Sequence, residues 1–169
     1  IDQAINRVLN SGWYVLGSEV EGFEKEFASF HGIDLHAVGV ANGTDAIALC
    51  LRGLGLGIGD EVITPSHTAV ATVAGIEQAG CTPVFADIDP KTRCITPKSI
   101  DERVTTKTRA IMPVHIYGQP AEMHSILEVA KAHNLSVLED CSQAHGAEIQ
   151  GQKVGTFADF SAYSCYPTK

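Results

Sequence analysis

The stretch "DEVITPSHTAVATVAGIEQAGCTPVFADI", residues 60–88, places two short apolar runs on either side of a longer segment with a helical pattern. We predict strands over 60–65 and 82–88 and a helix over 68–79. Two strands joined by a helix form a βαβ unit, in which the strands run parallel in one sheet. This stretch therefore predicts an α/β fold with a mostly parallel sheet flanked by helices.

The same alternation continues along the chain on both sides of this stretch. Further helices are predicted near 44–56, 97–104 and 120–133. Further strands are predicted for "HAVGV" (36–40), "RAIMPVHI" (109–116), "SVLED" (136–140) and "DFSAYSC" (159–165). The pattern indicates one sheet whose strands are separated by helices along most of the chain.

The first 31 residues have a different, purely helical pattern. "IDQAINRVLNSG" (1–12) has its apolar residues on one helix face, and "SEVEGFEKEFASF" (18–30) does the same, with Ser18 as its expected N-cap. We therefore predict a helical arm over 1–31 and one large α/β domain over 32–169.

The composition limits the class of protein. The chain has 20 acidic and 12 basic residues, a formal net charge of −8, and no cluster of Lys and Arg that would bind a nucleic-acid backbone. No apolar run approaches the roughly 20 residues that span a bilayer, so we predict a cytoplasmic protein without a membrane segment. The five cysteines form no CxxC pair and the seven histidines show no ligand spacing. We therefore predict no metal site and interpret the cysteines as buried apolar side chains.

In a parallel sheet, ligands bind beyond the carboxyl ends of the strands, so the residues that follow each strand are candidate site residues. "VANGTDAIAL" (40–49) passes from a predicted strand through Asn-Gly-Thr into a helix. Gly43 allows the backbone to approach a ligand closely, and Thr44 or Asp45 can cap the helix. The free N–H groups of the first turn suit an anion such as phosphate. A tight strand-to-helix turn without a ligand is the alternative.

"VLEDCSQAHGA" (137–147) places an aspartate at the end of a buried strand. A carboxylate there needs a cation or hydrogen-bond donors, and a pyridinium nitrogen is one suitable partner for Asp140. Helix capping by Asp140 is the alternative. Gln143 can reach the same ligand, whereas Glu139 points to the other face of the strand and is interpreted as structural. We interpret His145 as an ordinary buried histidine, and a contact to the substrate is the alternative.

The last residues, "SAYSCYPTK" (161–169), place a serine and a lysine after a predicted strand. Lys169 can act there as an amine nucleophile and base, and Ser164 can donate a hydroxyl to a phosphate. An exposed lysine without such a role is the alternative. Together, an anion site, a carboxylate, a glutamine and a lysine at strand ends are the groups that pyridoxal phosphate requires.

Several blocks of the sequence resemble one protein family, both in their residues and in their order along the chain. They are "SGWYVLGSEVEGFEKEFA", "NGTDAIAL", "GDEVITPS", "GCTPVFADID", "KTRAIMPVHIYGQPAEM", "EDCSQAHGA" and "SCYPTK". The chain thereby resembles the DegT/DnrJ/EryC1/StrS family, pyridoxal phosphate-dependent aminotransferases of fold type I that make amino sugars on nucleotide carriers. The resemblance implies an N-terminal piece of such an enzyme, with an incomplete large domain that stops at the Schiff-base lysine. It also implies a homodimer that moves an amino group from glutamate to a keto sugar on a nucleotide diphosphate.

The resemblance assigns roles to individual residues. It implies that Lys169 forms the Schiff base with pyridoxal phosphate and that Asp140 pairs with the pyridine nitrogen, which makes these two the expected catalytic residues. It implies that Gln143 lies beside the 3-hydroxyl group of the cofactor. The groups expected to hold the phosphate are the backbone of Gly43 and Thr44 and the hydroxyl of Ser164.

One position departs from the family pattern. Where family members usually stack an aromatic side chain on the cofactor ring, the sequence has Ala69, so we assign the stacking role to the nearby His67. The same scaffold also serves cyclitol aminotransferases and sugar dehydratases, although the dehydratases carry histidine in place of the lysine. Two non-catalytic alternatives are a module that senses the cofactor and an α/β binding domain without a cofactor.

Overall fold

The computed structural model describes residues 1–32 and 35–169. The chain folds as two compact units, Ile1–Gly39 and Val40–Lys169, and the arm and domain predicted from the sequence stay predictions. The first unit contains two helices, α1 (Asp2–Ser11) and α2 (Ser18–His31), as the helical pattern predicts. The predicted N-cap is wrong, because Ser18 is already helical and Gly17 occupies the cap position without a side-chain bond.

The second unit is built on a five-stranded parallel sheet with the strand order β2-β1-β3-β4-β7. This arrangement confirms the predicted α/β class. The sheet contains β1 (Glu61–Pro65), β2 (Thr82–Ala86), β3 (Thr108–Ile111), β4 (Ser136–Asp140) and β7 (Phe160–Ala162). β3 is shorter than predicted because Pro113 has no N–H to continue the ladder. A short antiparallel pair lies outside this sheet and consists of β5 (Glu148–Ile149) and β6 (Gln152–Lys153).

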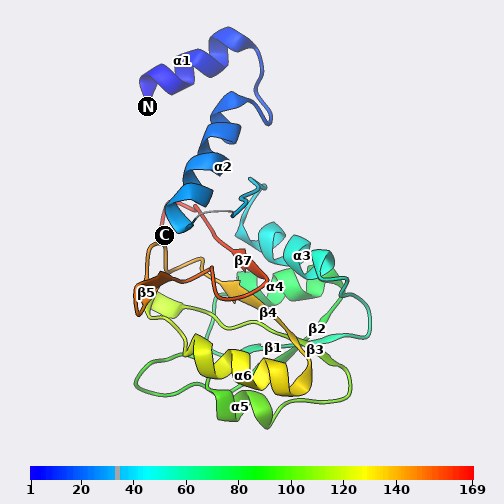
Figure 1. The fold of residues 1–169 in the computed structure, drawn as a ribbon. Helices are drawn as coiled ribbons and strands as arrows, with labels where there is room; N and C mark the ends of the chain where they lie inside the picture. Colours follow the sequence, from blue (N-terminus) through cyan, green and yellow to red (C-terminus); the bar gives the residue numbers. More distant parts are fainter. Residues whose placement is uncertain (33–34) are drawn as a thin grey trace. The chain divides into compact units, whose positions relative to one another are not determined.

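Helices cover both faces of this sheet (Figure 1). One face carries α3 (Gly43–Gly53) and α4 (Val70–Ala79), and the other carries α5 (Pro97–Asp101) and α6 (Met123–His133). Alternate strand residues supply two apolar clusters, so Val62 packs with α3 and α4 while Ile63 packs with α5 and α6. These three layers leave the carboxyl ends of the strands at one edge of the sheet, where the polar residues after the strands meet.

The strand predicted for residues 36–40 is not formed, so this prediction is wrong. No strand in the described part of the chain pairs with the segment, and Val38 is 78% exposed. The Gly39 N–H instead donates to the Glu24 carboxylate at 2.6 Å. An alternating apolar pattern forms a strand only where a neighbouring strand supplies hydrogen bonds. The pattern itself does not indicate whether such a neighbouring strand exists.

Glu139, on β4, is a fully buried carboxylate with four hydrogen-bond donors. Its oxygens accept three backbone N–H groups from residues 155–158 at 2.7–3.0 Å and lie 3.0 Å from His115 Nε2. His115 Nδ1 accepts the Ala121 N–H at 3.0 Å, so Nε2 carries the ring proton and donates it to Glu139. Glu139 therefore has a structural role, because it binds the loop over residues 155–158 to β4 by hydrogen bonds.

The buried Cys141 lies close to His115 and Glu139, and their potential ligand atoms fall within 4.8 Å of one another. These atoms are not free for a metal, because the His115 and Glu139 atoms are already hydrogen-bonded as described. Burial also raises the pKa of the Cys141 thiol well above its ordinary value, which keeps the sulfur protonated. The interpretation of all cysteines as buried needs correction, since Cys165 is exposed and Cys50 is partly so.

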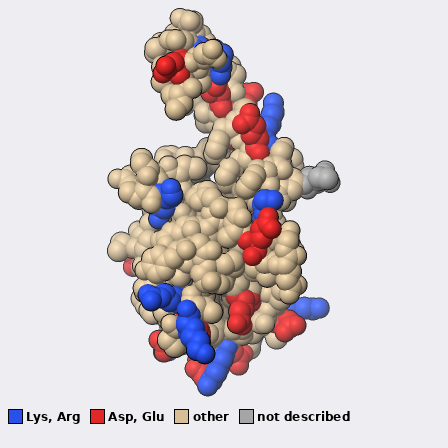
Figure 2. Space-filling model, turned by 90° about the vertical axis from the view of Figure 1, so that its left-hand side faces the viewer, with Lys and Arg blue, Asp and Glu red and all other residues tan. Residues whose placement is uncertain are grey.

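The described ranges contain no helix that is long and apolar enough to cross a bilayer. Figure 2 shows acidic and basic side chains next to each other on one face of the molecule. The described residues form exposed or partly exposed ion pairs such as Lys98–Glu102 at 3.8 Å and Arg109–Asp60 at 3.6 Å. On the lower part of the face shown, several basic side chains lie next to one another, with acidic side chains beside them.

Gly75 allows α3 and α4 to pack closely. A Cβ at this position would lie 2.7 Å from Ile47 Cγ2 and 3.0 Å from the Thr44 carbonyl oxygen. We therefore expect Gly75→Ala to lower the free energy of unfolding by about 1–3 kcal/mol in urea denaturation, partly offset by the better helix propensity of alanine. The control is Gly53→Ala in α3, where the new Cβ would make an ordinary 3.6 Å contact with Phe160. Equal losses in the two variants would contradict the packing explanation.

Candidate active site

A cavity of about 320 Å³ opens at the carboxyl ends of the parallel strands. Its lining comes from the starts of α3 and α4, the segment before α4, the end of β4 and the segment after β7. Small-molecule sites occupy roughly 300–1,000 Å³, so the cavity is large enough for a ligand. It brings together all but one of the predicted site residues, namely Gly43, Thr44, Asp140, Gln143, Ser164 and Lys169. The exception is His67.

The start of α3 presents backbone donors to this cavity. Asn42 is the N-cap, because its side chain accepts the Asp45 N–H at 2.9 Å and its carbonyl accepts the Ala46 N–H at 3.0 Å. The predicted capping by Thr44 or Asp45 is therefore wrong. The N–H groups of Gly43 and Thr44 are left without an intrahelical acceptor, and the helix dipole makes this end attractive to an anion.

Gly43 also lets the segment after β7 approach α3. A Cβ on Gly43 would lie 2.8 Å from Ser164 Cβ, which is too close for two carbon atoms that are not bonded to each other. Ser164 Oγ accepts the Tyr166 N–H at 3.4 Å, so the hydroxyl proton can still be donated to a ligand. We call the N–H groups of Gly43 and Thr44 and the Ser164 hydroxyl the anion cradle.

Asp140, the last residue of β4, is 3% exposed and faces the cavity. Its Oδ2 accepts the Thr72 hydroxyl at 2.8 Å, and its Oδ1 accepts the Ser142 N–H at 3.1 Å. No Lys or Arg within the described residues forms an ion pair with Asp140, so the carboxylate can still take a cationic partner from the cavity. No helix begins directly after Asp140, which removes the capping alternative.

Gln143 is oriented by the 3-10 turn Ile116–Gly118. Its Oε1 accepts the Tyr117 N–H at 2.9 Å, which leaves the Nε2 hydrogens as its donors. Tyr117 has a φ of 55°, a left-handed conformation that is uncommon for a residue with a side chain. The unusual turn therefore sets which end of the Gln143 amide can donate to a ligand.

His67 is not among the residues that line the cavity. Its Nε2 lies 3.2 Å from Tyr117 Oη, and the two ring centroids are 5.7 Å apart in an edge-on arrangement. Ala69, two residues further on, does line the cavity. The cavity is thus lined by Ala69, at the position where an aromatic side chain was expected, and not by His67, to which the stacking role was assigned instead. The stacking role of His67 stays a prediction.

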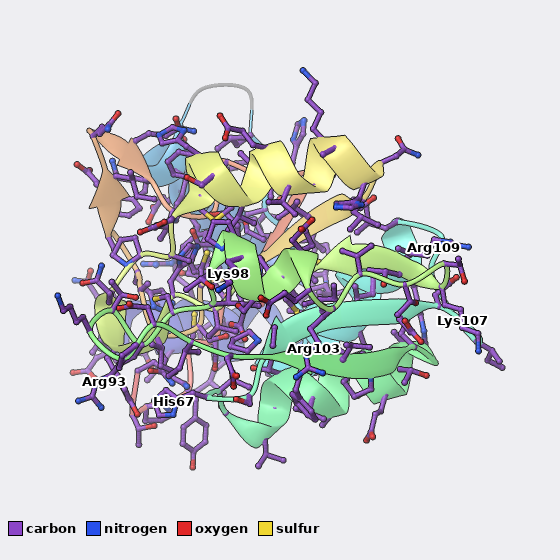
Figure 3. All side chains as sticks on the ribbon, turned by 90° about the horizontal axis from the view of Figure 1, so that it is seen from below. His67, Arg93, Lys98, Arg103, Lys107 and Arg109 are labelled. Carbon is purple, nitrogen blue, oxygen red and sulfur yellow. The ribbon has the colours of Figure 1, made fainter. Side chains whose placement is uncertain are left out.

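Lys169 is the one lysine or arginine among the residues that line the cavity. Its backbone N–H donates to the Tyr166 carbonyl at 2.9 Å. Figure 3 shows Lys107 and Arg109 at the other end of the sheet from His67, so these basic side chains lie far from the strand ends that form the site. Within the described chain, an anion in the cavity would therefore meet the anion cradle and Lys169.

Several contacts of the site were not predicted from the sequence. They are the Asn42 cap, the Thr72 and Ser142 donors to Asp140, and the Tyr117 donor to Gln143. The one signal in the sequence is the spacing of Thr68 and Thr72, which puts two hydroxyls one turn apart at the start of a helix. His145 was interpreted wrongly, because it is exposed and its ring lies 5.3 Å from that of Tyr163.

Comparison with known proteins agrees with this geometry. The sequence model of the DegT/DnrJ/EryC1/StrS aminotransferase family matches residues 1–169. The chain belongs to this family. One curated relative in it is the dTDP-3-amino-3,6-dideoxy-alpha-D-galactopyranose transaminase of Aneurinibacillus thermoaerophilus, which is 50% identical over 164 residues, 97% of this chain and 45% of the relative.

Solved protein structures share the fold of this chain. DesV of S. venezuelae in complex with a ketimine intermediate has a TM-score of 0.93 and 48% identity, covering 99% of this chain and 45% of DesV. NtdA of Bacillus subtilis with bound cofactor PMP has a TM-score of 0.92 and 36% identity, covering 99% of this chain and 37% of NtdA. The chain therefore spans less than half the length of each of these proteins.

Proposed function

We propose that the protein is a pyridoxal phosphate-dependent aminotransferase that moves an amino group from glutamate to a keto sugar on a nucleotide diphosphate. The observation that carries this proposal is the single cavity that joins Lys169, Asp140, Gln143 and the start of α3. The name of the Aneurinibacillus relative, a transaminase of a dTDP-linked amino sugar, supports the choice of a nucleotide-sugar substrate.

The donors and acceptors in the cavity fit this cofactor. Pyridoxal phosphate, when bound, supplies an aldehyde that links amines and a ring that accepts electrons from the substrate carbon. The anion cradle would bind the phosphate, and Asp140 would hold a proton at the ring nitrogen. The Gln143 Nε2 group would donate to the 3-hydroxyl oxygen, because its Oε1 is already occupied by Tyr117.

Lys169 would have two tasks in this mechanism. Its amine would attach the cofactor covalently in the resting protein. Once displaced by the amino donor, the same Nζ would take the proton from the substrate α-carbon and return it on the cofactor side. Asp140 and Lys169 thus have distinct functions, one holding charge at the ring and the other moving a proton.

The first test adds pyridoxal phosphate to the full-length protein that carries this sequence and records the visible spectrum before and after glutamate. We expect an absorbance band of the lysine-linked cofactor that disappears with glutamate, because the amino group passes to the cofactor. The absence of this band would overturn the cofactor proposal. A band that glutamate leaves unchanged would instead favour a cofactor-sensing module.

Gly43→Ala is expected to weaken the binding of pyridoxal phosphate by at least about tenfold, the value of roughly one hydrogen bond to a charged group. The new Cβ would lie 2.8 Å from Ser164 Cβ and would force the hydroxyl out of the anion cradle. Titration of the cofactor-free protein, followed by its fluorescence, gives the affinity. Gly53→Ala at the other end of α3 is the control, and an unchanged affinity in Gly43→Ala would refute the cradle.

Two further expectations concern the whole protein. The family resemblance implies a homodimer, and the lack of an apolar run of membrane-spanning length is the basis for the predicted cytoplasmic location. Both stay predictions, because the chain spans less than half the length of its relatives. Light scattering during size-exclusion chromatography of the full-length protein tests the dimer directly.

A further inference from the structure

Thr72 is a buried hydroxyl to which the mechanism above gives no role. It lies in the first turn of α4, is 1% exposed and lines the cavity. Its Oγ1 donates to Asp140 Oδ2 at 2.8 Å, although the two residues are 68 positions apart in the chain. The carboxylate that would face the ring nitrogen is therefore held by a side chain from another element.

A second hydroxyl lies behind the first. Thr68 Oγ1 is 2.7 Å from Thr72 Oγ1. A threonine hydroxyl has one proton, and that of Thr72 is donated to Asp140, so the Thr68 hydroxyl must be the donor to Thr72. The result is a chain of donors from Thr68 through Thr72 to Asp140, in which each bond polarises the next.

These hydrogen bonds act on a carboxylate that has no cationic side chain beside it. Asp140 Oδ1 accepts the Ser142 N–H, and Oδ2 accepts Thr72, while no described Lys or Arg pairs with either oxygen. Donors of this kind favour the charged form of a buried carboxylate. A carboxylate that is stabilised in its charged form takes a smaller share of any proton that it holds together with a ligand.

We propose that Thr72 is a positioning residue that keeps the proton shared between Asp140 and the cofactor on the ring nitrogen. The inference depends on the proposed function. When the Thr72 hydroxyl is removed, Oδ2 loses its donor and Asp140 takes a larger share of the proton. A ring that has lost part of its positive charge accepts electrons less readily from the substrate carbon.

The test uses Thr72→Val, which keeps the shape of the side chain and removes the hydroxyl. The full-length protein is loaded with pyridoxal phosphate carrying ¹⁵N in the ring. In Thr72→Val the NMR shift of the bound ring nitrogen is expected to move toward that of neutral pyridine. The rate of the half-reaction with glutamate should fall about 10- to 100-fold, as for the loss of one hydrogen bond to a charged group.

Two further variants make the test specific. Thr72→Ser restores the hydroxyl and should return both the ¹⁵N shift and the rate to the wild-type values. Thr68→Val leaves the bond to Asp140 in place but removes its polarising neighbour, so it should move the ¹⁵N shift in the same direction by a smaller amount. Thr106→Val, at an exposed position, is the matched control and should change neither quantity.

A wild-type ¹⁵N shift in Thr72→Val would overturn the proposal whatever the rate, because a loss of packing alone would slow the reaction without moving the proton. Failure of Thr72→Ser to restore the shift would overturn it as well. Failure of the proposed function is recognised separately, since the unmodified protein would then show no lysine-dependent absorbance band with pyridoxal phosphate.

Discussion

Lys169→Ala is expected to remove glutamate-dependent amino transfer and the covalent attachment of the cofactor together. Loss of the acid–base group alone slows proton transfer by about 10²- to 10⁴-fold, and loss of the covalent link adds to this effect. Single-turnover absorbance measurements with glutamate give the rate. Reduction with borohydride followed by mass spectrometry should find the cofactor on the peptide with Lys169 in the unmodified protein and on no peptide in the variant.

Lys107→Ala is the matched control, because Lys107 lies at the opposite end of the sheet and does not line the cavity (Figure 3). It should keep the absorbance band and the rate. The anion cradle and Asp140 are intact in Lys169→Ala, so this variant should still bind pyridoxal phosphate without a covalent link. A wild-type rate in Lys169→Ala, or cofactor attached to another lysine, would show that the role of Lys169 is assigned wrongly.

The strands could be predicted where a run of residues is buried on both faces of the sheet. In β1 and β4 almost every residue is buried, so a short apolar run between polar segments is enough to locate them. The early end of β3 could also have been predicted, because Pro113 cannot donate to the ladder. The segment 36–40 could not, since strand formation depends on a hydrogen-bonding neighbour from elsewhere in the chain.

The site could be predicted to the extent that topology determines it. Parallel strands bring their carboxyl ends to one edge, so Gly43, Asp140 and Ser164 were expected to meet without any distance being known. The local geometry of the loops does not follow from the topology of the sheet. The sequence alone therefore did not indicate that His67 contacts Tyr117 and does not line the cavity. Thr72 was missed because its contact depends on how α4 lies against the end of β4, which is a property of the packed layers.

Glu139→Gln is expected to lower the free energy of unfolding by about 3–5 kcal/mol, the usual cost of breaking a buried charged network. Each Glu139 oxygen accepts two N–H donors, those of Phe157 and Ala158 on one side and those of Gly155 and His115 on the other. A glutamine has one oxygen and one NH₂ group, so in either orientation two buried N–H groups would face other donors. Domains are stable by about 5–15 kcal/mol, so the expected loss is a large fraction of the total.

Urea denaturation of the full-length protein measures this loss, and Glu102→Gln provides the control. Glu102 is exposed and lies 3.8 Å from Lys98, so the same chemical change there should alter stability by no more than about 0.5 kcal/mol. Glu139→Gln that remains folded at low urea should still bind pyridoxal phosphate, because Asp140 faces the opposite side of β4 and keeps its Thr72 donor. A loss below about 1 kcal/mol would mean that water replaces the missing acceptor and that the loop over residues 155–158 does not depend on Glu139.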